Sequence, residues 1–195
     1  MLRDVLCAAA LVAMTPLLAA AQSFAPELII DAATGDWNKD DNQDLALLVG
    51  PEDGGQEIGI YIYVRDKDHP LLKLVTQAPA KIWGTSTLDG FFGQEPSITA
   101  LPSGSIAVTS QNSSIGRDRW EQTLTLAYRN GDFVVAGYTY TSYDTLEPDD
   151  GMKCDYNVLT GKVKRNDVAS KVAPRFVTIQ DWTDDTGPGP CKINN

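Results

Sequence analysis

The chain has 195 residues and an acidic balance, with 26 Asp and Glu against 16 Lys and Arg, which gives a net charge of −10. No run of basic residues interrupts this acidity, so nucleic acid and anionic lipid are poor candidates for partners. The same acidity fits solubility and cation binding equally well, and it does not choose between them.

The N-terminal segment has the features of a secretory signal peptide. Arg3 precedes an apolar run over residues 5–20, and Ala19 and Ala21 are small residues of the kind that a signal peptidase accepts. The run is short for a membrane span, and no basic flank follows it. The sequence therefore predicts a signal peptide over residues 1–21 and a mature chain of residues 22–195 that is periplasmic or secreted and has no membrane span.

The chain beyond residue 22 shows the hydrophobic pattern of strands rather than of helices. Residues 58–65 and 120–128 alternate apolar and polar side chains with a period of two, which is typical of half-buried strands. Asn130-Gly131 separates residues 120–128 from another apolar run at 133–140, and this dipeptide favours the type I′ turn of a β-hairpin. Further strands are expected at residues 27–31, 44–50, 71–76, 97–101, 105–110, 153–159, 162–165 and 175–181.

Short strands at this spacing predict an antiparallel all-β domain, and no low-complexity linker divides the chain. We expect one domain over residues 22–195, with sheets in a blade-like or sandwich-like arrangement. Residues 77–96 have the least regular pattern and are expected to form a long loop or a short helix.

One stretch concentrates oxygen-bearing side chains. In GDWNKDDNQDLALLV, residues 35–49, they occupy every second position at Asp36, Asn38, Asp40, Asn42 and Asp44, before the chain turns apolar. Calcium takes six to eight oxygen ligands, and a tight loop can supply them from alternate residues. The stretch is not an EF-hand, because the positions that would hold the invariant Gly and the bidentate Glu hold other residues.

The stretch resembles the calcium-binding loop of FG-GAP and VCBS repeats, which form the blades of integrin-type β-propellers. The resemblance covers residues 26–64 and a single copy. It implies that Asp36, Asn38, Asp40 and Asp44 bind calcium through their side chains and that Asn42 binds through its carbonyl. Lys39 takes a place often held by Gly, and Asp41 replaces the usual Gly, although Asp tolerates the left-handed region. Residues 154–162, CDYNVLTGK, look like a stretch of small exported bacterial proteins that carry one such loop.

The alternative for the loop is a turn rich in Asx residues, whose carboxylates accept hydrogen bonds from backbone amides. Four carboxylates crowded in one loop repel each other, which favours a bound cation, and Lys39 offsets part of that repulsion. Both interpretations stay open at this point.

The cysteines predict one disulfide bond. Removal of the signal peptide takes Cys7 away and leaves Cys154 and Cys191. Two cysteines in an oxidising compartment most simply pair with each other, and no CxxC motif points to redox chemistry. The expected bond ties the C-terminal segment to the body of the domain.

The sequence contains no convincing catalytic residue. The single histidine, His69, lies in a charged turn, and paired carboxylates of the kind that serve glycoside hydrolysis occur at Asp149-Asp150 and Asp184-Asp185, with Asp144 and Glu147 nearby. We therefore expect an exported calcium-binding domain with a binding or structural role and an unknown protein or glycan partner. The alternative is a secreted carbohydrate-active hydrolase with structural calcium.

Overall fold

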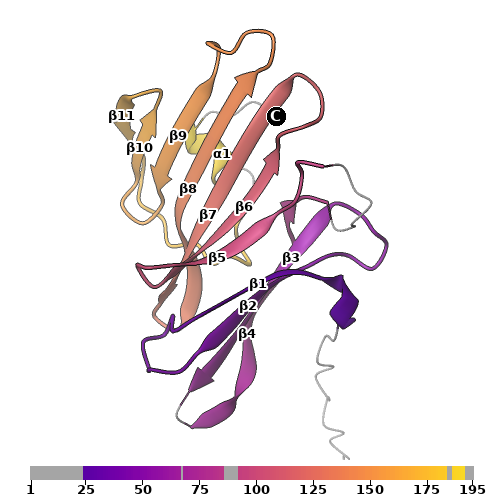
Figure 1. Cartoon of the computed structure of the whole chain (residues 1–195). Coiled ribbons are helices and arrows are strands. Elements are labelled where there is room, and N and C mark those ends of the chain that lie inside the picture. Colours follow the sequence, from indigo (N-terminus) through magenta and orange to yellow (C-terminus); the bar gives the residue numbers. More distant parts are fainter. Residues whose placement is uncertain (1–23, 67, 86–91, 184–185, 192–195) are drawn as a thin grey trace, which may run out of the picture.

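The computed structural model describes residues 24–66, 68–85, 92–183 and 186–191. The expected signal peptide and Asp184-Asp185 lie outside these residues. Two antiparallel sheets, one of four strands and one of seven, make up nearly all of the regular structure (Figure 1). The fold is thus all-β and sandwich-like, which confirms the predicted class.

The four-stranded sheet is formed by the first part of the chain, after a short 3₁₀ turn η1 (Pro26–Leu28). Each strand pairs with the next one in sequence, so the order is β1-β2-β3-β4. The strands are β1 (Ile29–Gly35), β2 (Asp44–Val49), β3 (Glu57–Asp66) and β4 (His69–Trp83).

Strand β2 is apolar on both faces because each face packs in a different cluster of apolar side chains. Ala46 and Leu48 belong to the main core, whereas Leu47 and Val49 form a smaller cluster with Tyr61 on the other face. The segment that precedes β1 covers this smaller cluster, and the ring of Phe24 lies 4.9 Å from that of Tyr61.

The seven-stranded sheet has the order β11-β10-β9-β8-β7-β6-β5, again with sequential neighbours paired (Figure 1). The predicted hairpin at Asn130-Gly131 joins its two longest strands, and both turn residues have positive φ angles, of 54° and 94°. The strands are β5 (Ser97–Leu101), β6 (Ser105–Asn112), β7 (Asp118–Arg129), β8 (Asp132–Asp144), β9 (Met152–Asn157), β10 (Lys162–Arg165) and β11 (Val168–Lys171).

The main core lies between the two sheets. The four-stranded sheet contributes alternate residues of β3, and the larger sheet contributes inward-facing residues of β6 to β10. At one side β1 lies against β5, where the Ile98 amide donates to Asp31 Oδ2 at 2.8 Å. The largest fully buried side chains include Ile58, Ile60, Ile62, Ile106, Leu126, Phe133, Tyr138 and Tyr156.

The C-terminal segment folds back onto the body of the protein. The Val135 amide donates to the Val177 carbonyl, and the Ile179 amide donates to the Phe133 carbonyl, so this segment runs beside the start of β8. Helix α1 (Pro188–Cys191) follows, and Cys191 forms a disulfide bond with Cys154 of β9. The predicted pairing of the two cysteines is confirmed.

The strand expected at residues 27–31 instead begins at Ile29 and continues to Gly35, and three further segments differ from the sequence-based expectation. Residues 77–83 were expected in a loop or helix, but they continue β4, because a bulge with a positive φ at Ala80 accommodates Pro79 inside the strand. Residues 175–181 were expected to form a strand, yet they make only one β-bridge, at Thr178. Strand β11 was not predicted, since all four of its residues are exposed and its sequence, VASK, does not alternate apolar and polar side chains.

Candidate functional site

The oxygen-rich loop joins β1 to β2, and Gly35 pairs with Asp44 at its base. The side chain of Trp37 points into the core, where it is only 3% exposed and lies edge-on to Phe133 at 6.3 Å between ring centroids. The loop is therefore anchored to the larger sheet through its aromatic residue, although it belongs to the smaller sheet.

The loop folds around the carboxylate of Asp36. The Asp40 amide donates to Asp36 Oδ1 and the Asp41 amide donates to Asp36 Oδ2, both at 3.0 Å. Lys39 and Asp41, the two departures from the glycine-rich family pattern, have φ angles of 64° and 65°. An L-residue pays about 1–2 kcal/mol for this conformation, and Asp pays less than Lys because its short side chain bonds locally. The backbone thus adopts the turn without the glycines.

Asp44 is a buried carboxylate at the end of the loop, with an exposure of 1%. Its Oδ2 accepts from the Trp37 amide and its Oδ1 accepts from the Arg65 amide, both at 3.0 Å. Burial raises the pKa of Asp44, the two backbone hydrogen bonds oppose this shift, and the negative charges of Asp40 and Asp36 reinforce it. Among the described residues, no Lys, Arg or His side chain forms an ion pair with Asp44.

The side chains of both asparagines are directed at Asp40. Asn38 Nδ2 donates to Asp40 Oδ2 at 2.9 Å, and Asn42 Nδ2 donates to Asp40 Oδ1 at 3.1 Å. Desolvation would raise the pKa of Asp40, but these bonds and the one from the Asn42 amide lower it below its usual value. These contacts are of the type that an Asx-rich turn makes.

The side-chain oxygen atoms of this loop are ligands of the type that a hard cation such as calcium binds. Each oxygen of Asp36 and Asp44 accepts one of the hydrogen bonds above and has a second lone pair. Within the described parts of the chain, however, no three acidic, His or Cys side chains come close enough to hold a metal ion. Calcium would therefore require Asp40 and the two asparagines to exchange their mutual hydrogen bonds for metal contacts.

Sequence reasoning missed one part of this site. The Arg65 amide, which holds Asp44, belongs to β3 and lies 21 positions away in sequence. This contact could have been found only from the register of β2 with β3, in which Leu45 pairs with Tyr63.

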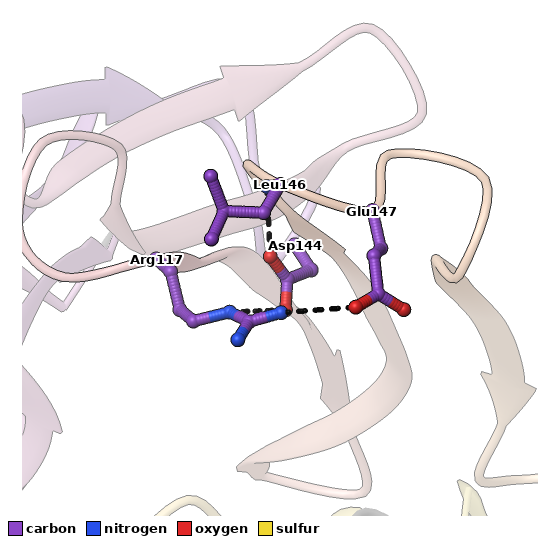
Figure 2. Close-up of polar contacts among 4 residues, drawn as sticks. All are labelled: Arg117, Asp144, Leu146 and Glu147. Carbon is purple, nitrogen blue, oxygen red and sulfur yellow. Dashed lines mark hydrogen bonds and ion pairs between the residues drawn. The ribbon is translucent and has the colours of Figure 1, made fainter.

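Asp144 and Glu147, the two carboxylates near the acidic pair Asp149-Asp150, both contact a basic side chain. Arg117, in the loop between β6 and β7, lies between Asp144 and Glu147 (Figure 2). Its Nη2 is 2.5 Å from Asp144 Oδ2 and 3.5 Å from Glu147 Oε1, and the Leu146 amide donates to Asp144 Oδ1 at 2.9 Å. These two carboxylates share one cation at the end of the sheet.

The Arg117 contact predicts a pH-dependent contribution to stability. The hydrogen bond and charge of Arg117 lower the pKa of Asp144, so this contribution is complete above about pH 4, the usual range of Asp in an unfolded chain. It is lost as the pH falls through the lowered pKa of Asp144. We expect Arg117→Ala to melt slightly below the wild type at pH 7, and the gap to close as the pH falls through the lowered pKa of Asp144.

Thermal melts between pH 7 and pH 2 check this expectation. Arg129→Ala is a matched control, because Arg129 is also exposed but, among the described residues, it donates to the carbonyl of Tyr128 and forms no ion pair. A gap for Arg117→Ala that stays constant over the whole range would contradict the assignment.

Comparisons with protein-family models, with curated proteins and with solved structures give no match to this chain. The resemblance to FG-GAP and VCBS repeats therefore depends on the residues of the loop itself. Of the helices in the described part of the chain, none has the length and apolar character needed to cross a membrane.

Proposed function

We propose that this protein is an exported β domain that binds one calcium ion in the loop between β1 and β2. Asp36, Asn38, Asp40 and Asp44 would hold the ion through side-chain oxygens, and Asn42 would hold it through its carbonyl. The ion would supply positive charge to a loop of carboxylates and fix the hairpin against the core. The role is one of binding or structure, with a protein or glycan as partner.

The observation that carries this proposal is the environment of Asp44. The Asp44 carboxylate is only 1% exposed, so it has lost most of its hydration. Two backbone amides donate to it and two further carboxylates lie near it, but no positive charge within the described residues replaces the lost water. Burial of a charge is costly unless it is paired or coordinates a metal. Calcium supplies the missing charge and accepts only oxygen ligands, which this loop offers.

Thermal melts with excess calcium and with a chelator test the proposal. A dissociation constant of roughly 10⁻⁴–10⁻³ M is usual for extracellular modules. At a hundredfold excess over it, binding to the folded state adds about 2.7 kcal/mol to the free energy of unfolding. For a chain of this size the midpoint should rise by roughly 5–10 °C.

Two variants make the test specific. Asp40→Ala removes a central ligand and should abolish most of the calcium-dependent shift, although its melting point in chelator also falls because the Asn42 amide loses its acceptor. Asp41→Asn removes one negative charge from the same loop and keeps a residue that tolerates positive φ, so it should keep the shift. If calcium leaves the wild-type midpoint unchanged, the loop is an Asx-rich turn.

A further inference from the structure

The strand register gathers basic residues that are separate in the sequence. Residues 151–175 contain six Lys and Arg but only two Asp, within a chain whose net charge is −10. Lys162 pairs with Lys171 and Lys164 pairs with Asp155, so these side chains share the exposed face of β9, β10 and β11. Lys153 is on the same face of β9, because the exposed residues Lys153, Asp155 and Asn157 alternate with the buried residues Cys154 and Tyr156. We call Lys153, Lys162, Lys164 and Lys171 the basic face.

Strand β11 forms the outer edge of the seven-stranded sheet beside this basic face (Figure 1). All four of its residues are exposed, and Val168 is 70% exposed. No strand among the described residues pairs with its outer side. Such an edge presents backbone donors and acceptors to any extended chain that approaches it.

The pairing pattern identifies which backbone groups point outward. The Val172 amide donates to the Gly161 carbonyl at 2.8 Å, and hydrogen-bonded pairs alternate along an antiparallel ladder. Val163 with Ser170 and Arg165 with Val168 are therefore the bonded pairs of β10 and β11. Ala169 and Lys171 consequently direct their N–H and C=O groups away from β10, toward the open side.

The charges on this edge oppose pairing with a second copy of the chain. An antiparallel contact of β11 with itself would bring the basic face of one copy beside the basic face of the other, and neighbouring like charges are destabilising. A strand with carboxylates on the same face would be attracted instead. Lys164 already contacts Asp167 at 2.8 Å, but both side chains are largely exposed, and an exposed ion pair of this kind is weak.

We propose that β11 is a docking edge for an extended acidic segment of a partner protein. The segment adds as a further strand and forms backbone hydrogen bonds with Ala169 and Lys171. The segment has acidic side chains at alternate positions, and one of them lies directly opposite Lys171. Because Ala169 is small, the next carboxylate is also within reach of Lys164 across β11. This surface is separate from the loop between β1 and β2 and does not depend on calcium.

The test uses the full mature chain and a fluorescein-labelled peptide of alternating glutamate and valine, with binding measured by fluorescence anisotropy. We expect the wild type to bind this peptide and to ignore a peptide of alternating lysine and valine. Lys171→Glu combined with Lys162→Glu should weaken binding at least tenfold. Asp40→Ala should bind as the wild type does, which separates this result from the calcium experiment.

Ala169→Pro isolates the backbone contribution. It removes an outward N–H that makes no ladder bond to β10 and leaves every charge in place, so it should also weaken binding at least tenfold while the melting point stays near that of the wild type. If that variant does not fold, the glutamate and valine peptide can be methylated on alternate backbone amides, and its binding to the wild-type protein tests the same backbone hydrogen bonds.

Three outcomes would overturn the proposal. One is a wild type that does not bind the glutamate peptide. Another is full binding by folded Ala169→Pro or by the methylated peptide, which would make the surface a site of charge attraction only. The third is equally tight binding of heparin or of vesicles with anionic lipid that Ala169→Pro does not reduce, which would indicate a polyanion as ligand.

Discussion

Replacing Trp37 by alanine should lower the free energy of unfolding by about 3–5 kcal/mol, which is the usual cost of removing a large buried aromatic side chain. Trp37 is 3% exposed and packs edge-on against Phe133 of the other sheet. Its indole also lies over Gly35, where an added Cβ would come within 2.8 Å of Trp37 Nε1. The variant therefore loses a contact between the sheets and the anchor of the β1–β2 loop together.

Urea unfolding followed by circular dichroism measures this loss. Trp37→Phe is the matched control, because it keeps an aromatic ring beside Phe133 and should lose clearly less than the alanine variant. Trp120→Ala is a second control, since Trp120 is only partly buried and packs against Trp83 at 5.4 Å. A loss of no more than about 0.5 kcal/mol for Trp37→Ala, which is typical of surface positions, would mean that the loop is not anchored through this residue.

Removing the disulfide bond should have a comparable effect, of about 3–4 kcal/mol. Cys154 and Cys191 are 37 positions apart with a Cα–Cα distance of 5.8 Å, and closing a loop of this length restricts the unfolded chain by an amount in that range. The double variant Cys154→Ala with Cys191→Ala should therefore unfold at a lower urea concentration than the wild type.

The reductant dependence provides the control for this experiment. Dithiothreitol should lower the stability of the wild type toward that of the double variant and should leave the double variant unchanged. A variant that unfolds at the wild-type urea concentration would contradict a stabilising role for the bond. Each buried Sγ contributes to packing as well, because Cys154 is 4% exposed and Cys191 is fully buried.

Most of the strands could be predicted because their side chains alternate and their turns have specific chemistry. The hairpin of β7 and β8 is the clearest case, since Asn130 and Gly131 adopt the positive φ angles that the sequence predicts. The end of β4 could not be predicted, because Pro79 normally ends a strand and the bulge at Ala80 depends on the register with β3. Residues 175–181 look like a strand, but they meet the sheet only at a single bridge between Thr178 and Val134.

In the candidate site too, features set by neighbouring residues could be predicted, and features set by contacts with a distant strand could not. The alternation from Asp36 to Asp44 indicates a loop in which oxygen atoms gather, and the structure shows that Asp36 organises the turn through two backbone amides. The burial of Asp44 and its hydrogen bond from Arg65 arise from the pairing of β2 with β3. They depend on register, which a one-dimensional pattern does not encode.

The sequential strand order also has a consequence for how the chain folds. Every ladder joins strands that are neighbours in sequence, so each hairpin closes a short loop and can form early at small entropic cost. Contacts of high sequence separation join the two sheets at more than one place, as where the Ile98 amide donates to Asp31 Oδ2 and where Lys81 Nζ donates to the carbonyls of Gln180 and Trp182. Folding should then proceed as two meanders that form independently, with the packing of one against the other as the slow step.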